Sequence, residues 1–501
     1  MNENVLVHLV DSLPTTLDPA VGYDSSAMSV IQNIYETLVT YSGSEVRQVA
    51  PLLAESWTVS SDQRRFTFRL RSGVRFHNGH PLTAECVVYS LRRAMQLNQG
   101  PAWILSQCLA SEDVRSLDEA TVEMTLTRPF PAFLFCLAHT VASIVDPATV
   151  EDHGSVIPNQ VNAWLTAHAV GTGPFMLDHW QPEAKLVLRR NPSYWRECAK
   201  LAEIQIQQVR AMTARTQALL CGEADLAQMS NVEAWQLRAQ PGIQVVSGSG
   251  LDREMIGFNC RQAPFADVRI RQAIAYAIDY EALLSLEPGY QVYRTAGPIP
   301  EPIEGHAAAG FCFFCERARA QALLQAAGYA HGFATTLTCN DLRQRRRIAE
   351  IVANSLRAVQ IEVRVEALPW TDFVSRLAQG TLPMFAWNWV PDYPDPDSYL
   401  YPIYHSQSIE NQAGYHNPMI DSFIEAARAE PDPAKRAELY REIQHIVIED
   451  APYLFMVQGL DLFAHRRRVR GIVYHPLRQV GDPVDYYPLY KDEEFDVHER
   501  H

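Results

Sequence analysis

Two periods of hydrophobic residues run along this chain and predict strands mixed with helices. Residues 66–71 and 122–126 alternate between apolar and polar side chains, which is typical of strands that bury one face. Residues 25–41 and 266–278 instead place apolar side chains three and four positions apart, which predicts amphipathic helices. Because both kinds of segment occur throughout the 501 residues, the pattern predicts a mixed α/β fold.

The segment from residue 383 to residue 400 follows neither period. Residues 384–390 are apolar and aromatic, as in a buried strand, and three prolines and three aspartates then follow. Proline cannot continue a strand ladder, so the strand must end abruptly. A strand that ends in aromatic and carboxylate side chains is suited to form the wall of a ligand-binding cleft. Composition alone favours a simpler alternative, a core strand followed by a surface turn, because most aromatic residues belong to cores.

Residues that favour helix ends mark three boundaries. Thr83 is expected to cap the helix that follows it, and Asp432 followed by Pro433 predicts the start of a helix that reaches about residue 449. Gly328 stands where the preceding helical pattern stops, which is the usual place of glycine after a helix.

The length and charge of the chain limit its organisation and its partners. At 501 residues the chain exceeds the usual size of one domain, so two or three lobes are expected. The formal net charge of −15 argues against nucleic acid and anionic membranes as partners. Short basic runs at residues 345–347 and 466–468 are interpreted as solvated faces. No apolar run reaches the length of a membrane span.

The nine cysteines are odd in number and dispersed, so they do not predict a disulfide framework. Cys312 and Cys315 form the one close pair, which is half of a zinc-binding motif without its second half. Packing, or one local disulfide in an oxidising compartment, is the simpler interpretation. We therefore expect neither a metal nor another cofactor.

The sequence lacks the common enzyme motifs. It contains no G-x-S-x-G, no H-E-x-x-H and no Walker loop. Residues 171–175, Gly-Thr-Gly-Pro-Phe, lack the third glycine of a dinucleotide loop. Asp392, Asp395 and Asp397 could serve a hydrolase only if two of them flanked a scissile bond. A hydrolase that uses this acid cluster is kept as the hypothesis from the class of enzymes.

Several segments together resemble the family 5 extracellular solute-binding proteins, which are the peptide, nickel, opine and oligosaccharide receptors of ABC importers. These segments are Leu17-Asp18-Pro19, residues 34–38 (IYETL), residues 70–87 (LRSGVRFHNGHPLTAECV), residues 171–175 (GTGPF), residues 191–195 (NPSYW), residues 222–227 (GEADLA), residues 267–279 (DVRIRQAIAYAID) and residues 389–396 (WVPDYPDP). The resemblance covers nearly the whole chain.

The resemblance implies a two-lobed periplasmic binding protein fold of the cluster C type, with an additional third domain and a hinged central cleft. Lobe I would be discontinuous, with the extra domain II and lobe III inserted into it. The expected ranges are 1–46, 166–258 and 470–501 for lobe I and its tail, 47–165 for domain II, and 259–469 for lobe III. Two crossovers between lobes I and III would let the protein, expected to be a monomer, close around its ligand.

The resemblance also implies where a ligand binds. In the peptide-binding members, the aspartate that follows the tryptophan-containing strand receives the α-ammonium group of the ligand, and here that residue is Asp392. Asn388, Trp389 and Val390 would offer backbone groups to a peptide. Asp397 is expected to cap the segment that follows.

The other residues expected at the ligand come from four places in the chain. They are Tyr23, Asp24 and Ser25 of one loop; His139, in the loop where nickel-chelate receptors carry an arginine; Arg343, which could receive a carboxylate bidentately; and Trp387, Tyr393 and His416, which lie in or after the aromatic and acidic segment. His405, between the acidic turn and His416, is a further candidate.

The expected function is capture of a short peptide or peptide-like solute in a closing cleft and its delivery to the permease subunits of an ABC importer in the membrane. A nickel-chelate or opine receptor of the same fold is the alternative within the family. Residues 1–30 show no signal peptide. We therefore expect a periplasmic protein whose signal peptide has been removed, or one that is tethered to the membrane.

Overall fold

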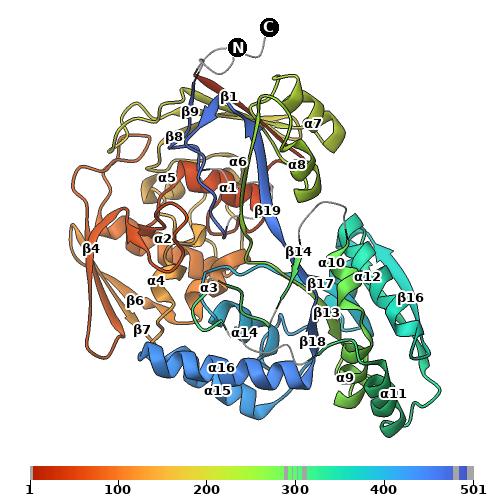
Figure 1. Ribbon diagram of the computed structural model, residues 1–501. Helices are drawn as coiled ribbons and strands as arrows, with labels where there is room; N and C mark the ends of the chain where they lie inside the picture. Colours follow the sequence, from red (N-terminus) through yellow and green to blue (C-terminus); the bar gives the residue numbers. More distant parts are fainter. Residues whose placement is uncertain are drawn as a thin grey trace. The chain divides into compact units, whose positions relative to one another are not determined.

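The computed structural model describes residues 4–286, 292–295, 297–301, 303–306, 313–477 and 485–492 (Figure 1). The chain forms two compact units. Unit 1 comprises residues 1–248 and 461–501, and unit 2 comprises residues 249–460. The finer division into lobe I, domain II and lobe III remains a prediction.

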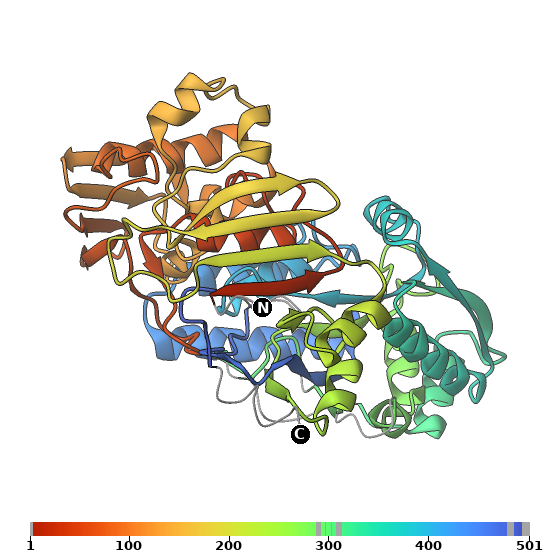
Figure 2. The ribbon, with the colours of Figure 1, turned by 90° about the horizontal axis from the view of Figure 1, so that it is seen from above.

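The main sheet of unit 1 is mixed, and its strand order is β12-β19-β11-β1-β10-β9-β8. The strands are β1 (Val5–Val10), β8 (Phe175–Gln181), β9 (Lys185–Arg190), β10 (Glu203–Gln208), β11 (Leu226–Ala227), β12 (Ile243–Ser249) and β19 (Val457–Arg466). Strand β1 is parallel to both of its neighbours, β10 and β11. In Figure 2 the yellow strands β8, β9 and β10 lie side by side next to the red β1. Helix α1 (Ser25–Ile34) contributes Ala27, Val30 and Ile31 to the hydrophobic core of this unit.

A second sheet in unit 1 is antiparallel, with the order β4-β5-β7-β6. Its strands are β4 (Ala54–Val59), β5 (Arg65–Leu70), β6 (Leu109–Asp118) and β7 (Thr121–Leu126), and helix α2 (Ala84–Leu97) packs against β6. Phe66, Phe68 and Leu70 of β5 are buried, while Arg65 before them and Arg69 between Phe68 and Leu70 are exposed. The alternation seen in the sequence is therefore confirmed as a strand with one buried face.

Unit 2 is built on a sheet of order β16-β15-β17-β13-β18. The strands are β13 (Arg253–Phe258), β15 (Phe333–Asn340), β16 (Ile361–Leu368), β17 (Met384–Trp389) and β18 (Tyr453–Phe455). Strand β15 is parallel to β16 and to β17, whereas β13 is antiparallel to β17 and β18. Helices α9 (Val268–Ala277), α11 (Arg317–Ala326) and α12 (Arg343–Arg357) supply buried side chains to the core. Helices α15 (Pro418–Ala429) and α16 (Pro433–Asp450) pack side by side (Figure 1).

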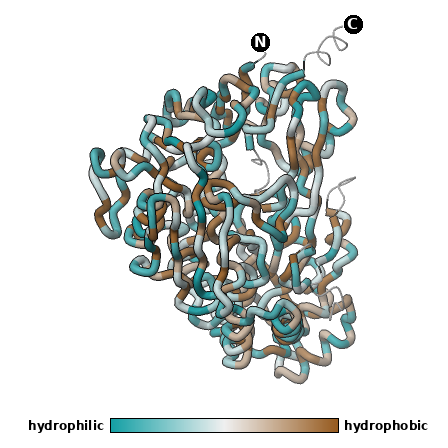
Figure 3. The backbone as a smooth tube through the Cα atoms, turned by 90° about the vertical axis from the view of Figure 1, so that its left-hand side faces the viewer, coloured by the Kyte–Doolittle hydropathy of each residue, from teal (hydrophilic) through white to brown (hydrophobic). Residues whose placement is uncertain are grey.

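The remaining elements are short. They are β2 (Val39–Thr40), β3 (Ala50–Pro51), α3 (Trp103–Ser106), α4 (Phe133–Cys136), α5 (Pro147–Asp152), α6 (Ala163–Ala167), α7 (Met212–Leu220), α8 (Asn231–Leu237), α10 (Tyr280–Leu284), β14 (Val292–Arg294), α13 (Trp370–Ala378), α14 (Asp397–Tyr404), β20 (Val469–Arg470) and β21 (Tyr490–Lys491), with 3₁₀ turns at Gly100–Ala102 and Thr140–Ala142. No helix in the described ranges combines the length and hydropathy that a membrane span requires. Figure 3 likewise shows short hydrophobic stretches interrupted by hydrophilic ones.

The helix boundaries confirm two of the sequence signals and correct two others. Asp432 accepts hydrogen bonds from the first N–H groups of α16, and Gly328 follows α11 with a positive φ of 88°. Thr83 precedes α2, but its side chain makes no capping hydrogen bond. The helix predicted to reach residue 41 ends at Ile34, since Tyr35 is already extended.

Glu36 explains why that helix stops early. Its carboxylate is buried and accepts hydrogen bonds from Thr172 Oγ1 (2.8 Å), Tyr194 Oη (2.7 Å) and Trp195 Nε1 (2.8 Å). Burial raises the pKa of Glu36, and the three donors oppose that rise. Three of the segments that carried the family resemblance therefore meet at one buried carboxylate.

The two glycines beside Thr172 are required by close packing. A Cβ atom at Gly171 would lie 2.0 Å from the carbonyl oxygen of Ile34, and one at Gly173 would lie 2.7 Å from it. This loop is therefore a packing contact with the end of α1. It is not a phosphate cradle, as its missing third glycine indicated.

Asp225 joins the two separate stretches of chain that make up unit 1. Its buried carboxylate lies 2.7 Å from Arg468 Nε and 2.7 Å from Lys491 Nζ, and it accepts a 2.8 Å hydrogen bond from the Val7 N–H. Arg466 and Arg468 are themselves buried, so the interpretation of residues 466–468 as a solvated face is wrong for these two. Because β19 and β20 carry them into the interior, their charges face Asp225 and backbone carbonyls instead of solvent.

Replacing Asp225 with alanine is expected to lower the free energy of unfolding by about 3–5 kcal/mol, because it leaves two buried cations without their partner. The measurement is equilibrium unfolding in urea. Glu183→Gln is the control, since Glu183 forms an exposed pair with Arg210 at 3.7 Å and should leave the midpoint unchanged. Equal midpoints for both variants would contradict the role given to Asp225.

Acidification is expected to destabilise unit 1 through His465. Burial lowers the pKa of His465 from 6.5 to about 4. Between these values the unfolded chain binds a proton that the folded chain does not, so the free energy of unfolding should fall by about 3 kcal/mol between pH 7 and pH 4 from this residue. Urea unfolding at both pH values should show a smaller loss in His465→Gln than in the wild type, and an equal loss would overturn the assignment.

Candidate ligand-binding site

Three parallel strands of unit 2 end at the same edge of its sheet. In the register of the sheet, Asn340 at the end of β15 is opposite Leu368 at the end of β16. Strand β17, which is parallel to β15, ends nearby at Trp389. Ligands of open α/β sheets bind outside the carboxyl ends of the strands. This edge, from which the 391–399 segment leaves, is therefore the candidate site in unit 2.

The aromatic residues at the end of β17 form a wall of two packed rings, which a hydrogen bond holds in place. Trp387 and Trp389 are almost completely buried, and their rings meet edge to face at 5.7 Å. The indole N–H of Trp389 donates a 2.6 Å hydrogen bond to the carbonyl oxygen of Ser398. Asn388 and Val390 are half-buried. The predicted strand and its abrupt end are thus confirmed, since β17 stops at Trp389.

Asp392 is half-buried and follows this wall by three residues. Its backbone N–H donates a 3.0 Å hydrogen bond to the hydroxyl oxygen of Ser398. Tyr393, also expected at the ligand, has a fully buried ring, and its hydroxyl donates to Asp397 Oδ2 at 2.8 Å. The side chain of Tyr393 therefore supports the turn from inside unit 2.

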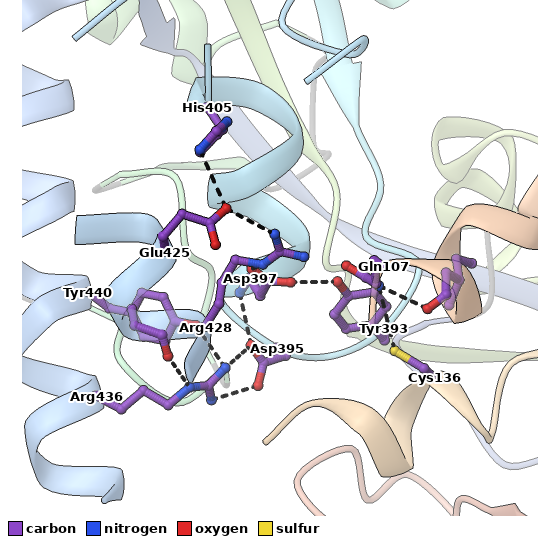
Figure 4. A network of polar contacts seen from close by, with 12 residues as sticks. Gln107, Cys136, Tyr393, Asp395, Asp397, His405, Glu425, Arg428, Arg436 and Tyr440 are labelled. Atoms are coloured by element: carbon purple, nitrogen blue, oxygen red, sulfur yellow. Dashed lines mark hydrogen bonds and ion pairs between the residues drawn. The ribbon is translucent and has the colours of Figure 1, made fainter. Parts of the chain in front are cut away.

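The other two aspartates of the cluster are bound to buried arginines (Figure 4). Arg436 contacts both oxygens of Asp395, at 2.8 and 2.7 Å. Arg428 Nε lies 2.8 Å from Asp397 Oδ1, and the Asp397 residue is only 1% exposed. Burial raises the pKa of Asp397, and the positive charge of Arg428 opposes that rise. Asp397 is the first residue of α14, and its carboxylate serves this ion pair, so the expectation that it only caps the next segment is wrong.

A second pair of charges at the same edge was missed in the sequence. Arg343 begins α12 and is exposed, whereas Arg345 is buried. Arg345 contacts both oxygens of Glu254, at 3.1 and 2.8 Å, and donates to Asn340 Oδ1 at 2.9 Å. Burial, followed by the charge of Glu254, raises the pKa of the neighbouring Asp252 to about 6.

Helical spacing could have identified Arg345. Ile348, Val352 and Leu356 lie three, seven and eleven positions after it and are all buried on α12, which puts Arg345 on the core-facing side of the helix. The interpretation of residues 345–347 as a solvated face is therefore wrong for Arg345, although Arg346 and Arg347 are exposed.

The candidates in unit 1 form one small group. The exposed ring of Tyr23 meets the ring of His139 edge to face at 6.4 Å. Burial lowers the pKa of His139 to about 4, and its Nδ1 accepts a hydrogen bond from the Val141 N–H at 3.1 Å. Asp24 caps α1 by accepting from the Ala27 N–H (2.8 Å), and Ser25 is the first residue of that helix.

Two further candidate histidines, His405 and His416, differ in burial. His416 is exposed just before α15, while His405 is buried with its Nε2 3.5 Å from Glu425. Cys312, and with it the question of a bond to Cys315, lies outside the described residues. Within the described residues, no three histidine, cysteine or acidic side chains are arranged to hold a metal ion.

Breaking the buried pair of the acidic turn should destabilise unit 2. Asp397→Asn is expected to lower the free energy of unfolding by about 3–5 kcal/mol, because the buried Arg428 would lose the nearer of its two carboxylates, Asp397 at 2.8 Å, and keep Glu425 at 3.4 Å. Urea unfolding measures this loss. The exposed Asp372 on α13 provides the control as Asp372→Asn, and a midpoint equally high in both variants would show that the pair is dispensable.

Comparisons with known proteins place this geometry in a family. The model of the bacterial extracellular solute-binding proteins, family 5 (middle region), matches residues 48–411. The probable D,D-dipeptide-binding periplasmic protein DdpA of Escherichia coli is 30% identical over 473 residues, which cover 93% of this chain and 90% of that protein. The glutathione-binding protein GsiB of Escherichia coli is 29% identical over 491 residues, with 95% and 92% coverage.

A solved structure shares the fold over nearly its whole length. The ABC transporter-associated periplasmic binding protein DppA of Helicobacter pylori, in complex with the peptide STSA, superposes with a TM-score of 0.83 at 26% identity and covers 97% of this chain and 98% of that one. The family model covers more than half of the chain, and the similarity to DdpA extends almost from end to end. The chain therefore belongs to family 5 of the bacterial extracellular solute-binding proteins.

Proposed function

We propose that this protein is the periplasmic receptor of an ABC importer for short peptides or peptide-like solutes, which it delivers to the permease subunits in the membrane. The observation that carries the proposal is the position of Asp392. It follows the end of a parallel strand at the carboxyl edge of the sheet, beside two buried tryptophans. The relatives named for dipeptides and glutathione support the same class of ligand.

The chemistry of this edge suits the amino terminus of a peptide. The carboxylate of Asp392 would pair with an α-ammonium group, and the nearby indole of Trp389 would keep water from the pair and strengthen it. The backbone of Asn388, Trp389 and Val390 would bind the peptide main chain as an added strand does. Arg343, exposed at the start of the helix that follows β15, would receive the carboxylate at the other end of a short ligand.

We assign Tyr23 and His139 of unit 1 to contacts with the uncharged part of the ligand. Because burial lowers the pKa of His139 to about 4, its ring is neutral at pH 7. A neutral ring beside an exposed tyrosine suits the amide groups of a peptide better than a cation. Asp24 and Ser25 would support this contact by fixing the start of α1 next to Tyr23.

The acidic cluster does not favour a hydrolase. Acid–base hydrolysis requires two carboxylates that flank the bond to be cleaved. Asp395 and Asp397 are buried and face Arg436 and Arg428, so these two carboxylates are committed to the structure. A nickel chelate or an opine would occupy the same edge of the sheet. Such a ligand would be identified in an experiment by binding that does not depend on an ammonium group.

Asp392→Asn is expected to weaken peptide binding about thirtyfold or more, which corresponds to about 2 kcal/mol, because the ammonium group loses its counter-charge. Calorimetric titration with L-alanyl-L-alanine, D-alanyl-D-alanine and glutathione measures the loss, and the N-acetylated form of each peptide should already bind weakly to the wild type.

Asp372→Asn, which removes an exposed carboxylate that follows β16, is the matched control and should bind like the wild type. If Asp392→Asn also binds like the wild type, the ligand places no ammonium group there and the peptide assignment fails. A wild-type protein that binds no peptide of the panel would overturn the proposed function as a whole.

A further inference from the structure

Ser398 contacts two candidate ligand-binding residues at once. It is fully buried, and both of its oxygens accept hydrogen bonds from the chain that precedes the turn. The hydroxyl oxygen accepts the Asp392 N–H at 3.0 Å, and the carbonyl oxygen accepts the Trp389 indole N–H at 2.6 Å. One residue therefore connects the end of β17, the residue at the proposed ammonium site and the start of α14.

Ser398 is itself held in place from both sides. Its own N–H donates to the carbonyl oxygen of Asp395 at 3.0 Å, and the Asp397 N–H donates to the Asp395 carboxylate at 2.9 Å. On the other side, the Tyr399 hydroxyl donates to the carbonyl oxygen of Leu251 at 2.9 Å. All of these partners lie within unit 2, so the two oxygens of Ser398 are fixed before any ligand is bound.

The ion pairs add the rigidity that such a support needs. Arg436 holds Asp395, and Arg428 holds Asp397 (Figure 4). These arginines come from α16 and α15, so the turn is attached to two packed helices. A site whose supporting residues are locked in this way loses little freedom when the ligand binds.

We propose that Ser398 is a positioning residue, which fixes the backbone of Asp392 and the indole of Trp389 so that the carboxylate meets the ligand in one orientation. This inference rests on the proposed function, since it assigns a support to the proposed ammonium site. Without the hydroxyl oxygen, the Asp392 N–H loses this acceptor, and the orientation of its backbone is less firmly fixed. The role of Ser398 is thus to hold the Asp392 backbone in the orientation that presents its carboxylate to an ammonium group.

The first test compares two buried serines whose hydroxyl oxygens each accept a backbone N–H. Ser398 accepts that of Asp392, at the proposed site, and Ser355 accepts that of Asp279. Ser398→Ala should weaken binding of the tightest-binding peptide among L-alanyl-L-alanine, D-alanyl-D-alanine and glutathione by about tenfold or more. Ser355→Ala is the matched control, because the Ser355 hydroxyl is also buried in unit 2 and accepts a backbone N–H, that of Asp279, at 3.1 Å. Both variants should lose similar thermal stability, but Ser355→Ala should keep wild-type affinity. Equal losses of affinity in the two variants would overturn the inference.

The second test separates positioning from general damage. Ser398→Ala should weaken the free peptide but not its N-acetylated form, so the selectivity for the ammonium group should collapse. In the Asp392→Asn background, Ser398→Ala should cause no more than about a twofold further loss, because the group that it positions is already gone. Independent, additive losses would contradict the proposal. If Ser398→Ala does not fold, Ser398→Cys keeps the shape with a much weaker acceptor and enters the same comparisons.

The outcomes distinguish this inference from the proposed function. Loss of affinity in Asp392→Asn with wild-type affinity in Ser398→Ala overturns the role of Ser398 and leaves the peptide receptor standing. Wild-type affinity in Asp392→Asn overturns the ammonium site, and the role of Ser398 falls with it.

Discussion

Buried carboxylates that must keep their partners hold this protein together. A charge without its counter-charge inside a protein is strongly destabilising, so a buried pair forces the segments that carry it to fold as one. Asp225 applies this constraint to unit 1, because its partners Val7, Arg468 and Lys491 come from both ends of the chain. Asp18 and Arg93 do the same between the first loop and α2, in a pair that is also buried. The discontinuity of unit 1 is thus bridged by specific charges as well as by hydrophobic packing.

In unit 2 the same kind of pair serves a different purpose. The carboxylates of Asp395 and Asp397 form ion pairs with arginines on α16 and α15. These pairs fix the turn that carries Asp392. Three aspartates within six residues therefore have unlike surroundings, and burial is what distinguishes them. Asp395 and Asp397 are buried in ion pairs, while Asp392 is half-buried.

The sequence segments that identify the family are largely structural in this protein. Glu36, Thr172, Tyr194 and Trp195 meet in one buried cluster, and the glycines beside Thr172 are required by packing against Ile34. These residues define the scaffold that the family shares. The shared scaffold does not by itself determine the ligand, and so two members with the same scaffold can bind different solutes.

The sequence by itself determined the kind of fold and the family, because alternation, helix caps and short motifs are local. The strand that ends at Trp389, the cap at Asp432 and the glycine after α11 could all be predicted in this way. The lobe boundaries, the hinge, the monomeric state and the ligand contacts remain predictions. Only the tertiary structure decided which charges are buried. Arg428 and Arg436 are 31 and 41 residues from their aspartates, Glu254 is 91 residues from Arg345, and Glu36 is more than 100 residues from its donors. No local pattern specifies partners at such separations. From the sequence alone a charged side chain is interpreted as solvated, because only the fold brings its counter-charge beside it.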